Sequence, residues 1–283
     1  MTMDTAAYDR AAATKPIVEA SPAYRGYLRL LRRRTMLVRI YQFAILFAVL
    51  AIWEIAPRSG WVNPMLTSYP SAVFASFREL AISSGLFTHA MATLSSTLIG
   101  FAGSMLLGIA VAIALWLSPT LHRVLDPFIV VLNALPKIAL VPLFYIWLGD
   151  VASIYAMAIS VSVFVTVIML YTGFRSIDPD KIKLARLYGA SKRQLLTKIV
   201  LPGSVPTIMS ALKVNIGLTL VGVIVGEFQS ARAGLGYLIS YGSQIFQMNL
   251  VMLSIVLLAL ISCLLFAAVQ LLEAFVTRKS GFR

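Results

Sequence analysis

The sequence predicts an all-α, polytopic membrane protein with six transmembrane helices, and its composition is the first evidence. Of its 283 residues, 59% are hydrophobic and only 12% are charged, whereas soluble domains carry about 25% charged residues. The mean hydropathy is +0.87. This composition indicates a protein that resides in a lipid bilayer.

Six apolar runs are each long enough to cross a bilayer, which takes about 20 residues as a helix. They cover approximately residues 37–56, 91–117, 127–148, 151–174, 205–226 and 250–276. Only the short turn "LGDV" separates the third run from the fourth. Because no small-residue cleavage site follows the first run, we expect an uncleaved anchor there rather than a secretory signal peptide.

The distribution of positive charge predicts the orientation. Most of the 24 Lys and Arg residues lie before the first run, in residues 175–198 or after the last run. The opposite side of the membrane would hold only Arg58, Arg78 and Arg232. The positive-inside rule then places both termini in the cytoplasm. The net charge of +13 is thus a topology signal, and we expect no nucleic-acid partner.

We expect two parts in the chain. Residues 1–36 would form a cytoplasmic N-terminal tail and a basic membrane-surface segment, because arginines are dense just before the first apolar run. Residues 37–283 would form the transmembrane domain.

Small residues recur every four positions in the second run and predict a helix-packing face. Such a stripe lets a neighbouring helix approach closely. Its central members are Ser96, Gly100, Ser104 and Gly108. Gly222 and Gly226 repeat the spacing in the fifth run.

The third run holds candidates for a translocation pathway. Pro136 and Pro142 each remove a backbone hydrogen bond and would bend the helix. Lys137 is an ionisable residue at membrane depth, a default functional candidate that would attract an anion; alternatively, it snorkels to the cytoplasmic edge. Asn133 and Asn215 would line a pathway or bridge helices. We therefore take Asn133, Pro136, Lys137 and Asn215 as pathway candidates.

A basic amphipathic segment, "DPDKIKLARLYGASKRQLLTKIVLP", follows the fourth run. Asp178 predicts a helix N-cap with Pro179 at the first position, and Gly189 fits the left-handed residue that ends a helix. Ser191 and Gln194 match a capping box that starts a second helix, which would end before Pro202. Two interpretations stay open on these grounds: an interfacial hairpin on anionic lipid, or a docking element for a cytoplasmic protein.

The spacing of Gly189, Ile199, Leu201 and Pro202, after Ala185 and Arg186, resembles the "EAA" signature of permeases in bacterial ABC importers. "LDPFIVVLNALPKIALVPLFYIWLGD" and "GEFQSARAGLGYLI" are similar to segments of the nitrate, sulfonate and taurine branch. The resemblance covers roughly residues 40–275. One departure is Lys183, which stands where the signature usually has Glu.

The resemblance implies a type I importer fold, in which residues 178–200 form coupling helices that dock on an ATPase subunit. The residues that would make this coupling contact are Ala185, Arg186, Gly189, Ala190, Ser191, Ile199, Leu201 and Pro202. It also implies a bacterial inner-membrane location, a binding protein that delivers a small solute, a second permease copy and surrounding lipid. Sulfonate, taurine or nitrate would be the favoured solute. Lys183 suggests an ATPase with a different local charge.

The chain itself contains no G-x-x-x-x-G-K-[ST] motif, the signature of a phosphate-binding P-loop. ATP and Mg²⁺ would therefore be bound by the partner ATPase, and we expect no cofactor on this chain. No run holds a catalytic constellation, and His89 and His122 lack metal-ligand spacing, so we expect both at the surface. Glu227 would lie just beyond the fifth run, at the binding-protein surface or a helix end.

A secondary transporter or channel without an ATPase is the alternative. Against it, the apolar runs lack the chain of buried carboxylates typical of proton-coupled carriers, and we see no inverted repeat.

Overall fold

The computed structural model describes residues 22–83, 85–230 and 232–279, and these residues contain helices but no strand. The chain forms two compact units, residues 1–56 and 57–283, which are described separately. The described part of the first unit belongs to α2 (Pro22–Arg58), one uninterrupted helix. The boundary expected after residue 36 falls inside this helix.

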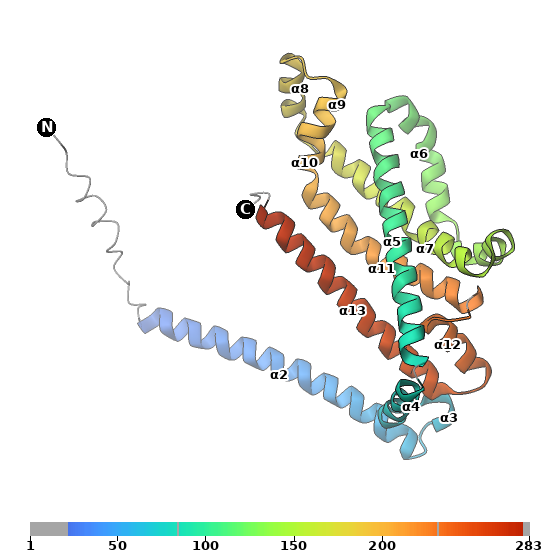
Figure 1. The fold of residues 1–283 in the computed structure, drawn as a ribbon. Helices are drawn as coiled ribbons and strands as arrows, with labels where there is room; N and C mark the ends of the chain where they lie inside the picture. The colour runs from blue at the N-terminus through green and yellow to red at the C-terminus, as the bar shows by residue number, and fades with distance from the viewer. Residues whose placement is uncertain (1–21, 84, 231, 280–283) are drawn as a thin grey trace. The chain divides into compact units, whose positions relative to one another are not determined.

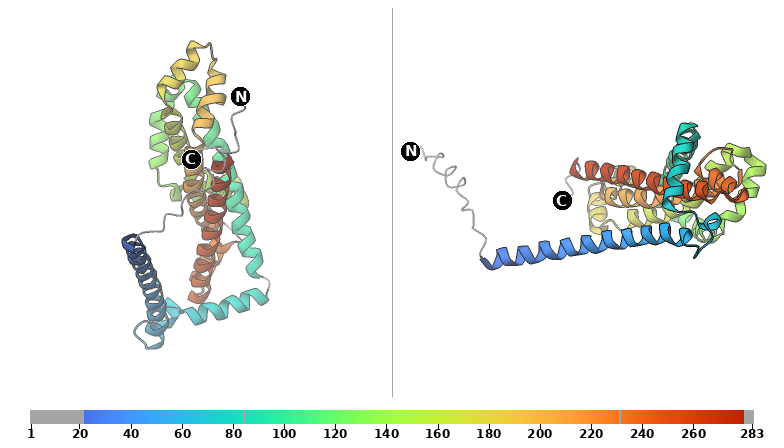
Figure 2. Two further views of the ribbon diagram at one scale, coloured as in Figure 1. Left: turned by 90° about the vertical axis from the view of Figure 1, so that its left-hand side faces the viewer. Right: turned by 90° about the horizontal axis from the view of Figure 1, so that it is seen from below.

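The second unit is a helical bundle (Figures 1 and 2). Its elements are α3 (Pro64–Thr67), α4 (Pro70–Ile82), α5 (Gly85–Leu117), α6 (Pro119–Ala134), η1 (Lys137–Leu140), α7 (Val141–Arg175), α8 (Pro179–Leu187), α9 (Lys192–Leu195), η2 (Leu196–Val200), α10 (Leu201–Gly203), α11 (Val205–Ser230), α12 (Leu235–Gln244) and α13 (Met248–Lys279). Helix α11 packs on α7, α5, α12 and α13. Helices α8 and α9 lie at one end of the bundle, and α3, α4 and α12 lie at the other (Figure 1).

Five segments of the described chain are long and apolar enough to span a membrane. They are Met36–Arg58, Gly85–Leu117, Lys137–Arg175, Val205–Gln229 and Met248–Val276. Five of the six predicted spans lie in these segments, one in each: the first, second, fourth, fifth and sixth, with the fourth predicted span (151–174) inside Lys137–Arg175. A sixth crossing and the membrane orientation stay predictions.

The third predicted span is interrupted near Pro136, where its prolines predict a bend, but the interruption is a full break between two helices. Helix α6 ends at Ala134, the 3₁₀ turn η1 follows, and α7 begins at Val141. Pro136 explains the break, since it has no amide proton to donate and it disfavours helical backbone at Leu135, which is extended. The predicted "LGDV" turn corresponds to a kink in α7 at Gly149, whose φ of 78° is left-handed.

The small-residue stripe of α5 lies in the centre of the bundle. Ser96, Gly100, Ser104 and Gly108 are all buried. A Cβ atom on Gly100 would lie 2.6 Å from the Cβ of Ala158, and one on Gly108 would lie 2.5 Å from Cγ2 of Thr166. The missing side chains therefore let α5 pack directly against α7.

Candidate functional site

Helix α8 begins with the cap that its sequence predicts. The Oδ1 atom of Asp178 accepts a hydrogen bond from the backbone N–H of Asp180 at 2.9 Å, and Pro179 occupies the first turn. The cap satisfies one of the free N–H groups at a helix start, and proline has no N–H to leave unsatisfied. The start of α8 is therefore fixed by residues within the segment itself.

A Schellman motif ends α8. Gly189 has a φ of +80°, and its N–H donates to the carbonyl of Arg186 at 2.9 Å. The N–H of Ala190 donates to the carbonyl of Ala185 at 3.0 Å. These two bonds are the pair that defines the motif. Ala185, Arg186, Gly189 and Ala190 thus form the elbow through their backbone atoms.

The capping box starts α9 as predicted. The Oγ of Ser191 accepts from the N–H of Gln194 at 3.3 Å, and the Oε1 of Gln194 accepts from the N–H of Ser191 at 2.8 Å. The predicted end before Pro202 was wrong, because the helical path continues through the π-helical turn η2 into α10. In this wider turn the N–H of Leu201 donates to the carbonyl of Leu196, and Pro202 follows within the first turn of α10.

The far side of the elbow is anchored in the bundle. Leu196 and Val200 are buried in a cluster with Phe174 of α7 and Ala112 of α5, and Leu201 packs against this cluster. Ile199 is half-buried and Pro202 is exposed. The segment that carries α8 and α9 is therefore packed against α5 and α7.

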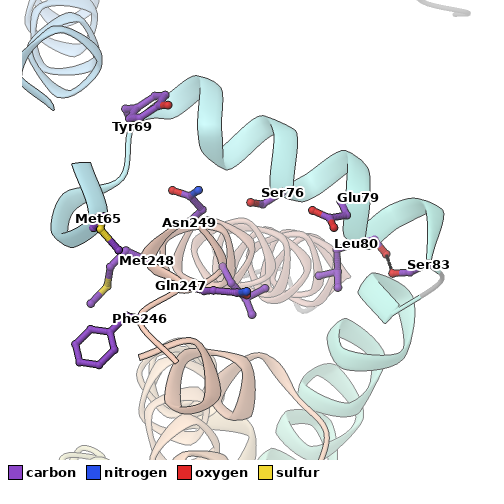
Figure 3. Close-up of a pocket in the computed structure, with 11 residues that line it drawn as sticks. Met65, Tyr69, Ser76, Glu79, Leu80, Ser83, Phe246, Gln247, Met248 and Asn249 are labelled. Atoms are coloured by element: carbon purple, nitrogen blue, oxygen red, sulfur yellow. Dashed lines mark hydrogen bonds between the residues drawn. The ribbon is translucent and has the colours of Figure 1, made fainter. Parts of the chain in front are cut away.

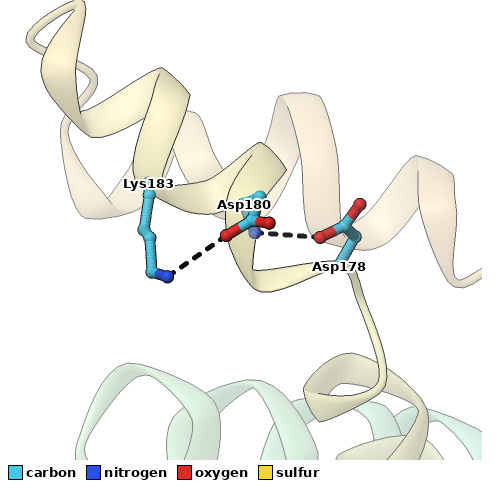
Figure 4. A network of polar contacts seen from close by, with 3 residues as sticks. All are labelled: Asp178, Asp180 and Lys183. Carbon is cyan, nitrogen blue, oxygen red and sulfur yellow. Dashed lines mark hydrogen bonds and ion pairs between the residues drawn. The ribbon is translucent and has the colours of Figure 1, made fainter.

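The surface of α8 combines apolar and charged side chains. Leu184 is 55% exposed, and Leu187 and Tyr188 are each 85% exposed. Lys183, which stands at the usual Glu position, forms an ion pair with Asp180 at 3.1 Å within the same helix (Figure 4). The charge of Lys183 is therefore partly balanced inside the segment. The adjacent apolar side chains remain free for another surface.

Asn215, a pathway candidate, lies at the junction of α5, α7 and α11 and is 1% exposed. Its Nδ2 donates to Oγ1 of Thr166 at 2.6 Å, and its Oδ1 accepts from Ser104 at 3.0 Å and Thr219 at 2.8 Å. Three helices are thus joined through one amide. These contacts match the bridging interpretation, and a pathway role stays a prediction.

The other pathway candidates lie together at the break between α6 and α7. The Nζ of Lys137 donates to the backbone carbonyl of Asn133 at 2.7 Å and lies 5.9 Å from the ring centre of Phe164. A cation at a helix C-terminus satisfies a carbonyl that has no partner within the helix. Pro136 is exposed beside it. Whether Lys137 meets substrate stays a prediction.

Glu227 differs most from its expected place. It lies inside α11, is 1% exposed, and its Oε2 accepts from Thr93 at 2.9 Å and from the N–H of Gly236 at 2.9 Å. Thr93 in turn accepts from the N–H of Leu235 at 2.8 Å. Of the two places expected for Glu227, the surface was wrong, because α11 extends to Ser230 and the side chain is buried. The helix-end alternative agrees with the structure, since Glu227 accepts from the N–H of Gly236 in the first turn of α12.

His89 also contacts the turn between α11 and α12. Its Nδ1 accepts from the N–H of Gly234 at 3.1 Å, and its ring stacks on Tyr237 at 5.9 Å. His122 stacks on Tyr171 at 4.2 Å. Both histidines are half-buried, which corrects the expectation that they lie at the surface. Within the described residues, no group of three His, Cys, Asp or Glu side chains is placed to hold a metal ion.

A cavity of about 610 Å³ opens at the end of the bundle opposite α8, between α3, α4 and the start of α13 (Figure 3). Tyr69, Glu79 and Asn249 are among its lining residues. Near it, Ser68 and Phe246 have φ values of 55° and 57°, unusual for residues other than glycine. Ser68 is fully buried and donates to Oδ1 of Asn249 at 2.7 Å. Strained backbone of this kind gathers at functional surfaces.

A further cavity of about 510 Å³ lies beside η1 and was missed by the sequence analysis. Ile138 lines one wall, and Gln229, Ser240 and Gln244 supply polar atoms from α11 and α12. These residues come from parts of the chain far apart in sequence and meet only around the cavity, so no local pattern identifies them.

Comparison with known protein families identifies the family of this chain. The model of the family described as "binding-protein-dependent transport system inner membrane component" matches residues 104–280, more than half of the chain. The chain belongs to this family. It is therefore a multi-pass inner-membrane permease component of an ABC importer, and the family implies a separate ATPase and a binding protein.

Individual relatives place the permease in one branch. The aliphatic sulfonates transport permease protein SsuC of Escherichia coli (strain K12) is 32% identical over 84% of this chain and 90% of its own length. The taurine transport system permease protein TauC of the same strain is 28% identical over 83% of this chain and 88% of its own. The nitrate import permease protein NrtB of Leptolyngbya laminosa is 26% identical over 86% of this chain and 90% of its own length.

A solved structure supports the fold. A chain of the MetNI methionine ABC transporter, in an inward facing conformation, superposes with a TM-score of 0.60 at 17% sequence identity. The match covers 71% of this permease and 98% of that chain. At this identity the likeness establishes the ABC permease fold and nothing about the substrate.

Proposed function

We propose that this permease forms the translocation pathway for a small anion in an ATP-driven importer and carries out no chemical step of its own. Two copies would pair in the membrane, with lipid around them. A binding protein would deliver the solute at the end of the bundle that holds α3, α4 and α12. Two ATPase subunits, which bind ATP and Mg²⁺, would dock at the end that holds α8 and α9.

The observation that carries this proposal is the form of residues 178–200. Caps at both ends make α8 a short helix of fixed geometry, while Leu184, Leu187 and Tyr188 remain exposed on it. Exposed apolar side chains on a rigid helix are typical of helix-in-groove recognition. Because Leu196 and Val200 anchor the same segment in the bundle core, closure of the ATPase pair would move α5 and α7.

The proposed solute is a sulfonate, taurine or nitrate. Support comes from the relatives, among which SsuC, TauC and NrtB are named for these solutes. Relatives named for formylaminopyrimidine and riboflavin are also similar to this chain, so the binding protein would make most of the selection. In the permease, we propose the break at Asn133, Pro136 and Lys137 and the neighbouring cavity at Ile138 as the pathway wall.

The docking role is tested by co-purification from detergent-solubilised membranes. Leu187→Glu places a charge on the exposed apolar face without altering either cap, and we expect the ATPase to be lost from the purified complex. Phe74→Glu is the matched control, because Phe74 is 69% exposed on α4 at the opposite end of the bundle. We expect this control to retain the ATPase.

If Leu187→Glu retains the ATPase at the wild-type level, the docking surface lies elsewhere. If wild-type permease brings down no ATPase even after chemical crosslinking, the importer proposal itself is contradicted. A secondary transporter or channel then becomes the better account.

A further inference from the structure

A cavity of about 510 Å³ lies on the bundle side of α8, separate from the exposed apolar face. Its walls come from the end of α5, the start of α6, the end of α7 and one side of α8. Ile182, Lys183 and Arg186 line it, whereas Leu184, Leu187 and Tyr188 do not. One face of α8 therefore lines the cavity, and another face exposes apolar side chains to the surroundings.

The cavity is strongly basic. Arg123, Arg175, Lys183, Arg186 and Lys192 all line it, and none of the described lining residues is Asp or Glu. Lys183 pairs with Asp180. Within the described chain, no carboxylate lies in ion-pair contact with the other four. Clustered cations with little neutralisation favour a bound anion.

The cavity is apolar on one side and lies at the ends of two apolar segments, where a membrane boundary is expected. Leu115, Trp116 and Phe174 form the apolar side, next to the points where the apolar segments Gly85–Leu117 and Lys137–Arg175 end. Tyr171 adds an aromatic ring, which stacks on His122 at 4.2 Å and lies 6.0 Å from the guanidinium of Arg175. Trp and Tyr are typical of the membrane–water interface.

We propose that this cavity binds a phosphate group, with the cations around the phosphate and the apolar side of the cavity next to it. An anionic phospholipid head group of the adjacent leaflet matches both surfaces, since its acyl chains would continue along α5 and α7. A free phosphate-containing solute shares the head-group chemistry and is distinguished by experiment. The site depends on the cavity alone and not on the proposed importer activity.

The test uses the full chain purified in detergent and titrated with three probes. These are phosphatidylglycerol, phosphatidylcholine of the same chain length, and inorganic phosphate, with bound probe measured by native mass spectrometry. We expect phosphatidylglycerol to bind more tightly than phosphatidylcholine. Arg123→Gln combined with Arg175→Gln should weaken it about 30-fold, because each basic side chain near a membrane surface contributes about a fivefold gain.

Arg193→Gln combined with Lys198→Gln is the matched control. It also removes two exposed cations from the same end of the bundle, and neither residue lines the cavity. We expect it to keep the preference for phosphatidylglycerol. Inorganic phosphate that binds alone, and is lost only in the Arg123/Arg175 variant, would assign the site to a soluble phosphate.

Equal binding of the two lipids by the wild type without binding of inorganic phosphate, or an equal loss in both double variants, would overturn the site. If the Arg123/Arg175 variant does not fold, salt titration of the wild type decides the question. High salt screens exposed charges and should abolish the phosphatidylglycerol preference. A preference that persists unchanged in high salt would contradict the proposal.

Discussion

The bundle interior and the α8–α9 segment are held together in different ways. In the interior, Asn215 joins Ser104 and Thr166, and Glu227 joins Thr93 and Gly236. Apart from the contact to Gly236, these bonds connect residues 49 to 134 positions apart. In α8 and α9, the side-chain caps connect residues two or three positions apart.

This difference predicts that stability and the proposed docking are separable in this permease. The interior depends on long-range contacts, so a change there should lower the stability of the whole bundle. The α8–α9 segment carries its own caps and exposes its apolar side chains, so a change there should impair docking and leave the bundle folded. Three substitutions test this separation.

The largest effect is expected for Glu227→Ala. The substitution removes the acceptor of Thr93 and of the Gly236 N–H and leaves a cavity at a residue that is 1% exposed. We expect the free energy of unfolding in mixed micelles to fall by about 3 kcal/mol. Glu227→Gln keeps the shape and an acceptor oxygen and should cost much less. Equal losses for the two variants would contradict the hydrogen-bonding role.

Gly222→Ala should have the next largest effect. A Cβ atom there would lie 2.7 Å from the Cα of Ala158, a backbone atom that cannot rotate away. We expect a loss of about 2 kcal/mol in the free energy of unfolding. Gly217→Ala on the same helix is the matched control, because nothing lies within 4 Å of its Cβ position. If both variants unfold alike, the close approach of α11 to α7 is not required.

Gly189→Ala should have the smallest effect on the free energy of unfolding, and the effect should be confined to the α8–α9 segment. No atom lies within 4 Å of the new Cβ, so the cost of about 1 kcal/mol comes from the left-handed backbone alone. Hydrogen exchange should increase in residues 178–200, with bundle unfolding unchanged. Gly189→Asn should exchange less than Gly189→Ala, since Asn tolerates this conformation. Loss of bundle stability in Gly189→Ala would show that the two regions are not separable.

The same difference explains what the sequence predicts well. The Asp178 cap, the Gly189 elbow and the Ser191–Gln194 box depend on neighbouring residues, and each is present as expected. The continuation through Pro202 was missed because a π-helical turn has no local signature in this segment.

Long-range contacts explain what the sequence predicts poorly. Glu227 has no neighbour in sequence that identifies Thr93, 134 positions away, as its partner. The cavity beside Ile138 is likewise lined by residues from α11 and α12, about 90 or more positions away in sequence. Pro136 predicted a bend, whereas the structure has a full break followed by a 3₁₀ turn.

The most direct test of the importer account is uptake into proteoliposomes that contain this permease, its ATPase and a binding protein loaded with radiolabelled taurine. The account predicts uptake that requires ATP and the ATPase and that is lost in Leu187→Glu. Uptake by the permease alone, driven by a proton or sodium gradient without the ATPase, would contradict it.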